Sequence, residues 1–124
     1  MSKSGTLYED GSRRWIHNGK LHRLDGPAIT NKSGSYQSWH YNGKLHRDGG
    51  PAIIRNDDFE MWYQHDKKHR LDGPAIVYKY NSNKWWINDQ EITSEVQEWI
   101  TENNIPSWKT WTDTDKLMFR MKFQ

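Results

Sequence analysis

The stretch that decides the fold is Trp15-Ile-His-Asn-Gly-Lys-Leu-His-Arg-Leu-Asp-Gly-Pro-Ala-Ile29, because the chain repeats it with small changes. A second copy runs from Trp39 to Ile53 and a third from Trp62 to Ile76. A shorter copy, Trp-Ile-Asn-Asp-Gln-Glu-Ile, runs from Trp86 to Ile92, so the four tryptophans stand 24, 23 and 24 residues apart. A fixed period of this size is typical of stacked structural units that each rest on their neighbours.

Each copy carries the signals of short strands joined by tight turns. Asn18-Gly19 and Asn42-Gly43 are strong hairpin signals, since such a turn needs a positive φ at both central residues. The third copy has His65-Asp66 at this place, so we expect a strained or longer turn there. Further strands are predicted after the proline of each copy, at 28–30, 52–55 and 75–80.

The predicted fold is mainly β with some α: an elongated single antiparallel sheet of consecutive hairpins with a C-terminal helical cap. We expect a flexible N-terminus at residues 1–7, hairpin repeats over 8–92 and a helical segment packing on the sheet over 93–124. About seven strands at ~4.8 Å would form a ribbon roughly 30 to 35 Å long. The edge strand of the first hairpin offers a route to a homodimer.

Two helices are predicted in the C-terminal segment, where they would cover the apolar end of the stack. The first starts at Thr93-Ser94-Glu95 and ends at Asn103-Asn104, and its apolar stripe is Val96, Trp99 and Ile100. The second starts near Asp113, and its apolar stripe is Leu117, Met118 and Met121.

The candidate structural core takes tryptophans and isoleucines from equivalent places in the units. Alternation along the strands puts the tryptophans on one face and Ile16, His40, Tyr63 and Ile87 on the other. We expect the indoles to form a packing ladder, each ring resting on the next. The alternative is a stacking platform for the bases of single-stranded nucleic acid. The core residues are Trp15, Trp39, Trp62, Trp86, Ile29, Ile53 and Ile76.

The composition favours a thin structure over one compact core. Hydrophobic residues make up 33% and charged residues 27%, while eight Trp, six Tyr and three Phe supply large apolar surfaces. The net charge of +2 falls short of the dense basic footprint of DNA-binding domains, and no cysteine is present for disulfides or thiolate metal sites. No apolar run approaches the ~18 residues of a transmembrane segment, and the N-terminus lacks the apolar core of a signal peptide. The expected location is therefore the cytoplasm.

The residues that could carry chemistry form one pair per unit, namely His22-Arg23, His46-Arg47 and His69-Arg70. On equivalent strands the histidines would stand ~9–10 Å apart, which is too far for them to share one metal ion. No Ser, Thr or Cys recurs beside them as a nucleophile. The sequence therefore predicts no metal, no cofactor, no catalytic residues and no enzyme activity.

Two interpretations of the His-Arg-x-Asp motif stay open. In the first, Arg and Asp neutralise each other while His bonds a backbone group at the strand edge. In the second, the arginines and the turn lysines form a basic row that meets an acidic or phosphate-bearing partner. Unit two departs from the motif, because Gly49 stands where the other units have Asp25 and Asp72. The candidate binding residues are Arg23, Arg47, Arg70, Lys20, Lys44, His22, His46 and His69, with Lys67 or Lys68 in unit three.

The pattern Trp-x-x-Asn-Gly-Lys-x-His resembles the MORN repeat, whose unit of about 23 residues runs Tyr-x-Gly-x-Trp-x-x-Gly-x-x-His-Gly-x-Gly. It is especially similar to the divergent Asn-Gly-Lys-Leu-His-Arg-x-Asp-Gly-Pro-Ala form, which is common in bacteriophage and giant-virus proteins of unassigned role. The resemblance covers residues 8 to about 92 and rests on Trp15, Trp39, Trp62, Gly19, Gly43 and the three repeat histidines. The chain departs from the family in lacking the Tyr-x-Gly opening and in having arginine where the family has glycine after the histidine.

The resemblance implies an elongated single-layer sheet that serves as a platform for proteins or acidic lipids, and the missing glycines argue against lipid binding. Its viral form implies a small accessory protein that acts on a host or defence component. We therefore expect a non-enzymatic protein-interaction module. The alternative is the binding of single-stranded nucleic acid or a nucleotide through the Trp and Arg/Lys rows.

Overall fold

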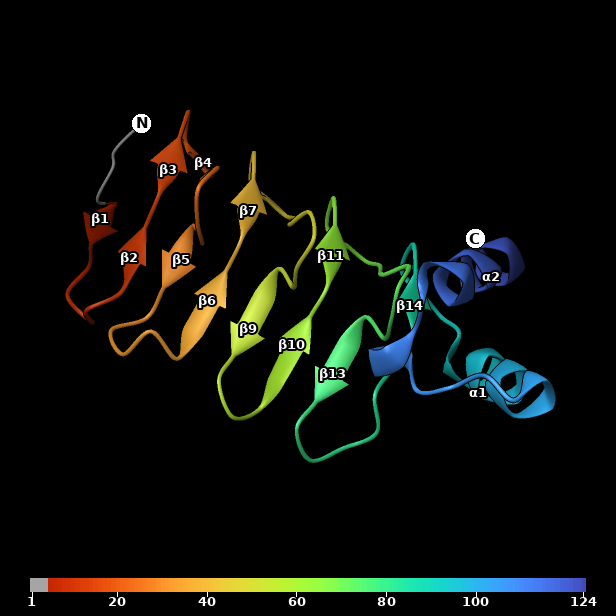
Figure 1. The fold of residues 1–124 in the computed structure, drawn as a ribbon. Coiled ribbons are helices and arrows are strands. Elements are labelled where there is room, and N and C mark those ends of the chain that lie inside the picture. Colours follow the sequence, from red (N-terminus) through yellow and green to blue (C-terminus); the bar gives the residue numbers. More distant parts are fainter. Residues whose placement is uncertain (1–4) are drawn as a thin grey trace.

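The computed structural model describes residues 5–124 and shows an elongated array of strands with helices at one end (Figure 1). Seven strands form one antiparallel sheet in the order β1-β2-β5-β6-β9-β10-β13, which confirms the predicted mainly β fold with a C-terminal helix. These strands are β1 (Thr6–Leu7), β2 (Arg13–Arg14), β5 (Ile29–Thr30), β6 (Tyr36–Ser38), β9 (Ile53–Arg55), β10 (Phe59–Met61) and β13 (Ile76–Tyr78).

Each unit adds a smaller hairpin beside this sheet. The hairpins are β3 (Ile16–His17) with β4 (Lys20–Leu21), β7 (His40–Tyr41) with β8 (Lys44–Leu45), β11 (Tyr63–Gln64) with β12 (Lys67–Lys68), and β14 (Trp86–Ile87) with β15 (Gln90–Glu91). Trp15 marks the change of partner: its N–H donates to the Ala28 carbonyl at 2.8 Å, and its carbonyl accepts from the His22 N–H at 2.9 Å. One extended segment therefore serves both the sheet and the hairpin.

The hairpin turns share one backbone conformation although their residues differ. The first central residue has a φ between 47° and 51° at Asn18, Asn42, His65 and Asn88. The His65-Asp66 turn is thus strained, as predicted, but it has the same length as the others. Asp66 compensates for the strain, because its carboxylate accepts the Leu45 N–H of the neighbouring hairpin at 2.7 Å.

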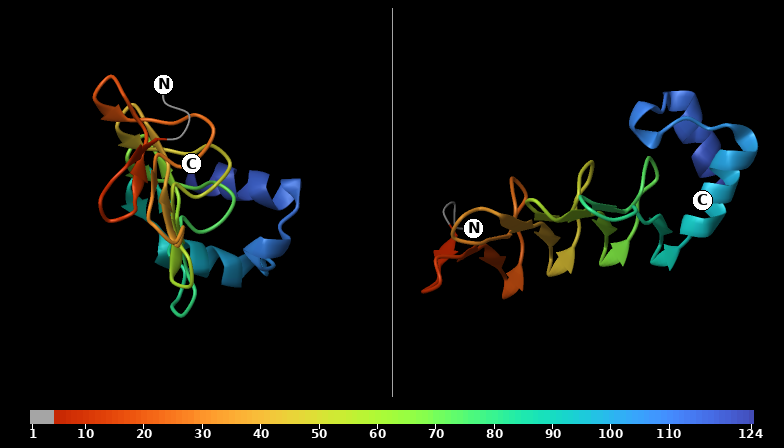
Figure 2. Two further views of the ribbon diagram at one scale, coloured as in Figure 1. Left: turned by 90° about the vertical axis from the view of Figure 1, so that its left-hand side faces the viewer. Right: turned by 90° about the horizontal axis from the view of Figure 1, so that it is seen from below.

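The two faces of the array differ in what covers them. Segments 22–27, 46–51 and 69–74, here called the clamp loops, fold back over one face, and the helices lie on that same side (Figure 2). We call this the loop-side face and the opposite one the open face. Strand register places a row of the open face at Ile29, Ser38, Ile53, Met61 and Ile76.

The predicted isoleucine core needs correction. Ala28, Ala52 and Ala75 lie on the loop-side face and are fully buried. Ile29 and Ile53 are only half-buried on the open face, while their counterpart in unit three, Ile76, is buried. Because all three alanines are completely buried, only a small side chain fits at this position.

The assignment of Trp86 as the fourth repeat tryptophan is also wrong, by one residue. The Ile92 N–H donates to the Trp85 carbonyl at 2.8 Å, as the histidine N–H does to the repeat tryptophan in the other units. Trp85 therefore holds the repeat position 23 residues after Trp62, and Trp86 faces the opposite way. Ile87, expected on the opposite face from the repeat tryptophans, lies with Trp85 in one buried cluster.

The C-terminal segment closes one end of the array with α1 (Thr93–Asn103), the 3-10 helix η1 (Trp108–Thr110) and α2 (Asp113–Phe123). Thr112 caps α2: its hydroxyl accepts the Asp115 N–H at 3.2 Å, and the Asp115 carboxylate accepts the Thr112 N–H at 3.0 Å. Both predicted helices are confirmed with their starts. The buried cluster beneath them consists of Trp85, Ile87, Val96, Trp99, Trp111 and Phe119.

The apolar stripe predicted for α2 is wrong, because Leu117, Met118 and Met121 are all exposed. Phe119 is fully buried instead, and its ring centroid lies 5.3 Å from that of Trp85 and 5.4 Å from that of Trp111. An aromatic side chain gains more than an aliphatic one from facing a cluster of rings, which decides the rotation of the helix.

The N-terminus differs in part from the predicted flexible segment. Thr6 and Leu7 pair with Arg14 and Arg13 as edge strand β1, while residues 1–4 lie outside the described residues. Within the described part of the chain, no helix has both the length and the apolar character that crossing a membrane requires.

Candidate functional site

Each clamp loop holds an arginine between an indole ring and a glycine. The guanidinium carbon lies 3.9 Å from the ring centroid of the unit's tryptophan in Arg23 and Arg47, and 3.8 Å in Arg70. A Cβ added to Gly26 would lie 2.9 Å from the Arg23 guanidinium carbon, so any other residue there would displace the guanidinium from its place. The Arg23 guanidinium also donates to the Pro27 carbonyl at 3.2 Å, which closes the loop onto itself.

In units one and three an aspartate completes this clamp. The Arg23 Nε donates to Asp25 at 2.9 Å, and the Arg70 Nε donates to Asp72 at 2.8 Å. The hydrogen bond from Arg23 lowers the pKa of Asp25. The interpretation in which Arg and Asp neutralise each other is therefore confirmed for these two units.

The repeat tryptophans do not form the predicted ladder of ring on ring. In units one to three, each indole packs against the arginine of its own unit, at the distances given above. One face of each ring is thus covered by a guanidinium, and Trp15 is buried altogether. A base would have to displace the arginine before it could stack on that face.

The repeat histidines join each unit to the next. The Nδ1 atoms of His22, His46 and His69 accept backbone N–H groups of the following hairpin at 3.0, 3.1 and 3.1 Å. A ring nitrogen that accepts carries no proton, so the neutral rings are protonated at Nε2. Burial lowers the pKa of His69, which favours this neutral form.

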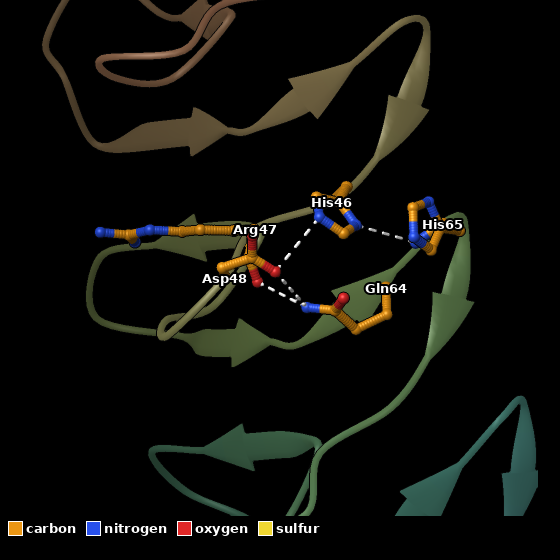
Figure 3. A network of polar contacts seen from close by, with 5 residues as sticks. All are labelled: His46, Arg47, Asp48, Gln64 and His65. Carbon is orange, nitrogen blue, oxygen red and sulfur yellow. Dashed lines mark hydrogen bonds and ion pairs between the residues drawn. The ribbon is translucent and has the colours of Figure 1, made fainter.

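Unit two is arranged differently around its displaced acid. Asp48 lies with one carboxylate oxygen 3.3 Å from the His46 Nε2 and accepts from the Gln64 amide at 3.4 Å. The same amide donates to the Arg47 carbonyl at 2.9 Å. Figure 3 shows the Arg47 side chain extending away from this network, so its guanidinium and the Asp48 carboxylate do not meet.

A groove of about 860 Å³ lies between the clamp loops of units one and two. Asp25 comes from the first loop and Arg47 and Asp48 come from the second, while Tyr41 of β7 and His46 contribute aromatic rings. Both carboxylates are strongly exposed, at 82% for Asp25 and 86% for Asp48. The groove can therefore offer apolar ring surface and charged groups to the same ligand.

A second groove, of about 500 Å³, lies one unit further along, between the third clamp loop and α2. Its Gln64 holds the place that Tyr41 holds in the first groove, two residues after the repeat tryptophan. Helix α2 contributes Lys116 and Arg120, which stand four residues apart on one helix face. The cap thus makes the second groove basic.

The structure brings five of the eight predicted binding residues to the two grooves. Arg23, Arg47 and His46 line the first, and His69 and Arg70 line the second. The other three lie outside the residues that line either groove: Lys20 and Lys44 on the hairpins, and His22, which bonds the next hairpin. Sequence reasoning missed Lys116 and Arg120, although their spacing of four residues was a visible signal of a shared helix face.

Comparisons with protein-family models, with curated proteins and with solved structures found no match to the chain. Among residues 5–124, no group of three or more His, Cys, Asp or Glu side chains is placed to hold a metal ion.

Proposed function

We propose that this protein is a non-enzymatic protein-binding module that holds an extended segment of a partner along its loop-side face. The observation that carries the proposal is the pair of grooves, which follow each other on one face of the array and are separated by one unit. One unit corresponds to two strand spacings, roughly 9 to 10 Å, which three residues of an extended peptide also span. Side chains of one segment can therefore enter both grooves.

The charges in the grooves favour a segment of mixed sign. The first groove presents the exposed carboxylates of Asp25 and Asp48. The second presents Lys116 and Arg120, and the described residues supply no ion pair to either cation. Complementary charges fix the register and direction of a bound segment more than they raise its affinity.

A protein segment is favoured over single-stranded nucleic acid by the state of the tryptophans. Stacking of bases needs an open ring face beside basic groups, and here the basic group already occupies a face of each ring. The net charge of +2 would also give little of the counterion release that drives nucleic-acid binding.

An array of short peptides of varied sequence tests this function directly. We expect a subset of peptides to bind the native protein, and the double variant Lys116→Ala with Arg120→Ala to bind them roughly tenfold more weakly. The matched control is Lys20→Ala with Lys44→Ala, which removes the same charge outside the grooves and should bind as the native protein does. The proposal fails if no peptide binds, or if both double variants bind equally well.

A further inference from the structure

Unit two lacks the carboxylate that completes the arginine clamp in its two neighbours. In units one and three the arginine Nε donates to an aspartate two residues later, at 2.9 and 2.8 Å. In unit two that place belongs to Gly49. The Arg47 guanidinium keeps its other two contacts, the Trp39 ring at 3.9 Å and the Pro51 carbonyl at 3.1 Å. Within residues 5–124, no carboxylate bonds its Nε.

The space beside Gly49 is open. A Cβ built at Gly49 would meet no atom within 4 Å, whereas one at the next residue, Gly50, would lie 2.9 Å from the Arg47 guanidinium carbon. Gly49 has a φ of 75°, while Asp25 and Asp72 do not have a positive φ, so the backbone of this loop also differs from that of its neighbours. The acid of this unit, Asp48, is turned toward His46 and Gln64 on the other side of the loop (Figure 3). The Arg47 Nε, which an aspartate bonds in the other two units, is therefore left without a carboxylate partner among the described residues and open to an outside group.

The environment of Arg47 also favours an added anion. Burial lowers the pKa of Arg47, and the more distant charge of Glu60 opposes that shift only in part. A guanidinium that is partly withdrawn from water gains more from a charge-assisted hydrogen bond than a solvated one does. Arg47 lines the first groove and Gly49 lines the second, so a segment that enters both grooves passes the place beside Gly49.

We propose that Arg47 binds a carboxylate of the partner, an Asp or Glu side chain, at the position that Asp25 and Asp72 occupy in their own units. The bound oxygen would accept from the Arg47 Nε, as the Asp25 and Asp72 oxygens do from Arg23 and Arg70. The identity of the ligand as part of a protein rests on the proposed function. The preference for a carboxylate rests on the two intact clamps alone.

Two double variants test this site, one that should remove it from unit two and one that should create it in unit one. Asp48→Leu with Gly49→Asp restores in unit two the Leu-Asp-Gly-Pro of units one and three, so the variant fills its own site. Leu24→Asp with Asp25→Gly gives unit one the sequence of unit two and frees Arg23. Each exchange uses a loop sequence that the fold already accommodates elsewhere. Because Gly49 has a φ of 75° and Asp25 and Asp72 do not have a positive φ, the first exchange requires loop 46–51 to take up the backbone of its neighbours. Circular dichroism of both variants checks that they fold.

The readout is the NMR resonance of the arginine Nε–H during titration with acetyl-Gly-Asp-Gly-amide, with the Asn peptide as the neutral control. In the native protein we expect the Arg47 resonance to respond to the Asp peptide at roughly tenfold lower concentration than to the Asn peptide. The first exchange should abolish the response at Arg47, and the second should create one at Arg23.

An equal response to both peptides, or an unchanged Arg47 response in the first exchange, would overturn the inference. A response to inorganic phosphate without one to the Asp peptide would overturn it as well. The titration reports on Arg47 alone and the peptide array on the whole module. If Arg47 responds to the Asp peptide but no peptide of the array binds, the proposed function is wrong and the anion site at Arg47 is still supported.

Discussion

At the scale of single residues, the arginine of each clamp loop does most to close its unit. Its guanidinium joins an indole, a proline carbonyl and, in two units, a carboxylate. The pairing of Arg with Asp could be predicted, because the two stand two residues apart in the motif. The contact with the indole could not, because it depends on the loop folding back over a strand that precedes it by eight residues, as Arg23 follows Trp15.

Replacing Arg70 with alanine should destabilise the protein strongly. Its side chain is only 10% exposed and packs on Trp62 while bonding Asp72. We expect a loss of about 2 to 4 kcal/mol in the free energy of unfolding, measured by urea denaturation. Arg55→Ala is the control, since that side chain is 61% exposed and should change stability by less than about 0.5 kcal/mol. If both variants lose the same unfolding free energy, the contacts of Arg70 with Trp62 and Asp72 do not stabilise the fold more than an exposed arginine does.

Stability should fall on acidification, and His69 should account for part of the fall. Burial lowers the pKa of His69 below its ordinary value of 6.5. The unfolded chain therefore binds more protons below that pH, so the contribution of His69 is complete above about pH 6.5 and is lost as the pH falls below it. Protonation at Nδ1 would also break the bond from the Asn88 N–H.

The measurement is the urea midpoint at about pH 7.5 and about pH 5.5, a range in which histidine is the main titrating side chain. His69→Gln cannot take up a proton, so its midpoint should fall less between the two pH values than that of the native protein. A fall of the same size in both proteins would exclude His69 as a cause.

At the scale of elements, the positions of the predicted hairpins and helices hold, while two rotations were wrong. Trp85-Trp86 offered two tryptophans for one repeat position. The turn decides between them, because Asn88 stands three residues after Trp85 as Asn18 does after Trp15, and the hydrogen bond from Ile92 to Trp85 agrees. In α2, the sequence allows either of two faces to turn inward: the face of Leu117, Met118 and Met121, or the face that carries Phe119. The inward face is decided by the rings of Trp85 and Trp111, which belong to other segments. The periodicity within α2 contains no information about them.

The corrected rotation of α2 gives a direct test of the cap. Phe119→Ala should cost about 3 to 5 kcal/mol in unfolding free energy, because it empties a fully buried aromatic site. Met121→Ala should cost less than about 0.5 kcal/mol, since Met121 is 77% exposed. Thermal or urea unfolding of both variants measures these losses. A larger loss of stability for Met121→Ala than for Phe119→Ala would mean that the stripe of Leu117, Met118 and Met121 faces the core after all.

At the scale of the whole molecule, the array is nearly one-dimensional. Each unit bonds to the next through its histidine and its clamp loop, as where the Arg23 N–H donates to the His40 carbonyl at 3.3 Å. In such an array stability is close to a sum over units and their interfaces. The period of the sequence predicted this architecture. The grooves could not be predicted, because the first lies between two clamp loops and the second between a clamp loop and the cap.

Deleting residues 39–61 should therefore leave a folded protein. The deletion removes one whole unit and joins Ser38 directly to Trp62, as Ser38 is joined to Trp39 in the native chain. We expect cooperative unfolding at a lower temperature than the native protein, because one interface is lost. The same variant should bind peptides more weakly, since the deletion removes Tyr41, Arg47 and Asp48 of the first groove. Loss of cooperative unfolding in circular dichroism would contradict an architecture of equivalent units.

The central claim is that a partner binds along the loop-side face. Mapping of backbone amide shifts, with a peptide chosen from the array, tests it most directly. Shifts should concentrate at residues 23–26 and 46–49 of the clamp loops and near Lys116 and Arg120. Shifts concentrated on the open face, along the row from Ile29 through Ile53 to Ile76, would contradict it.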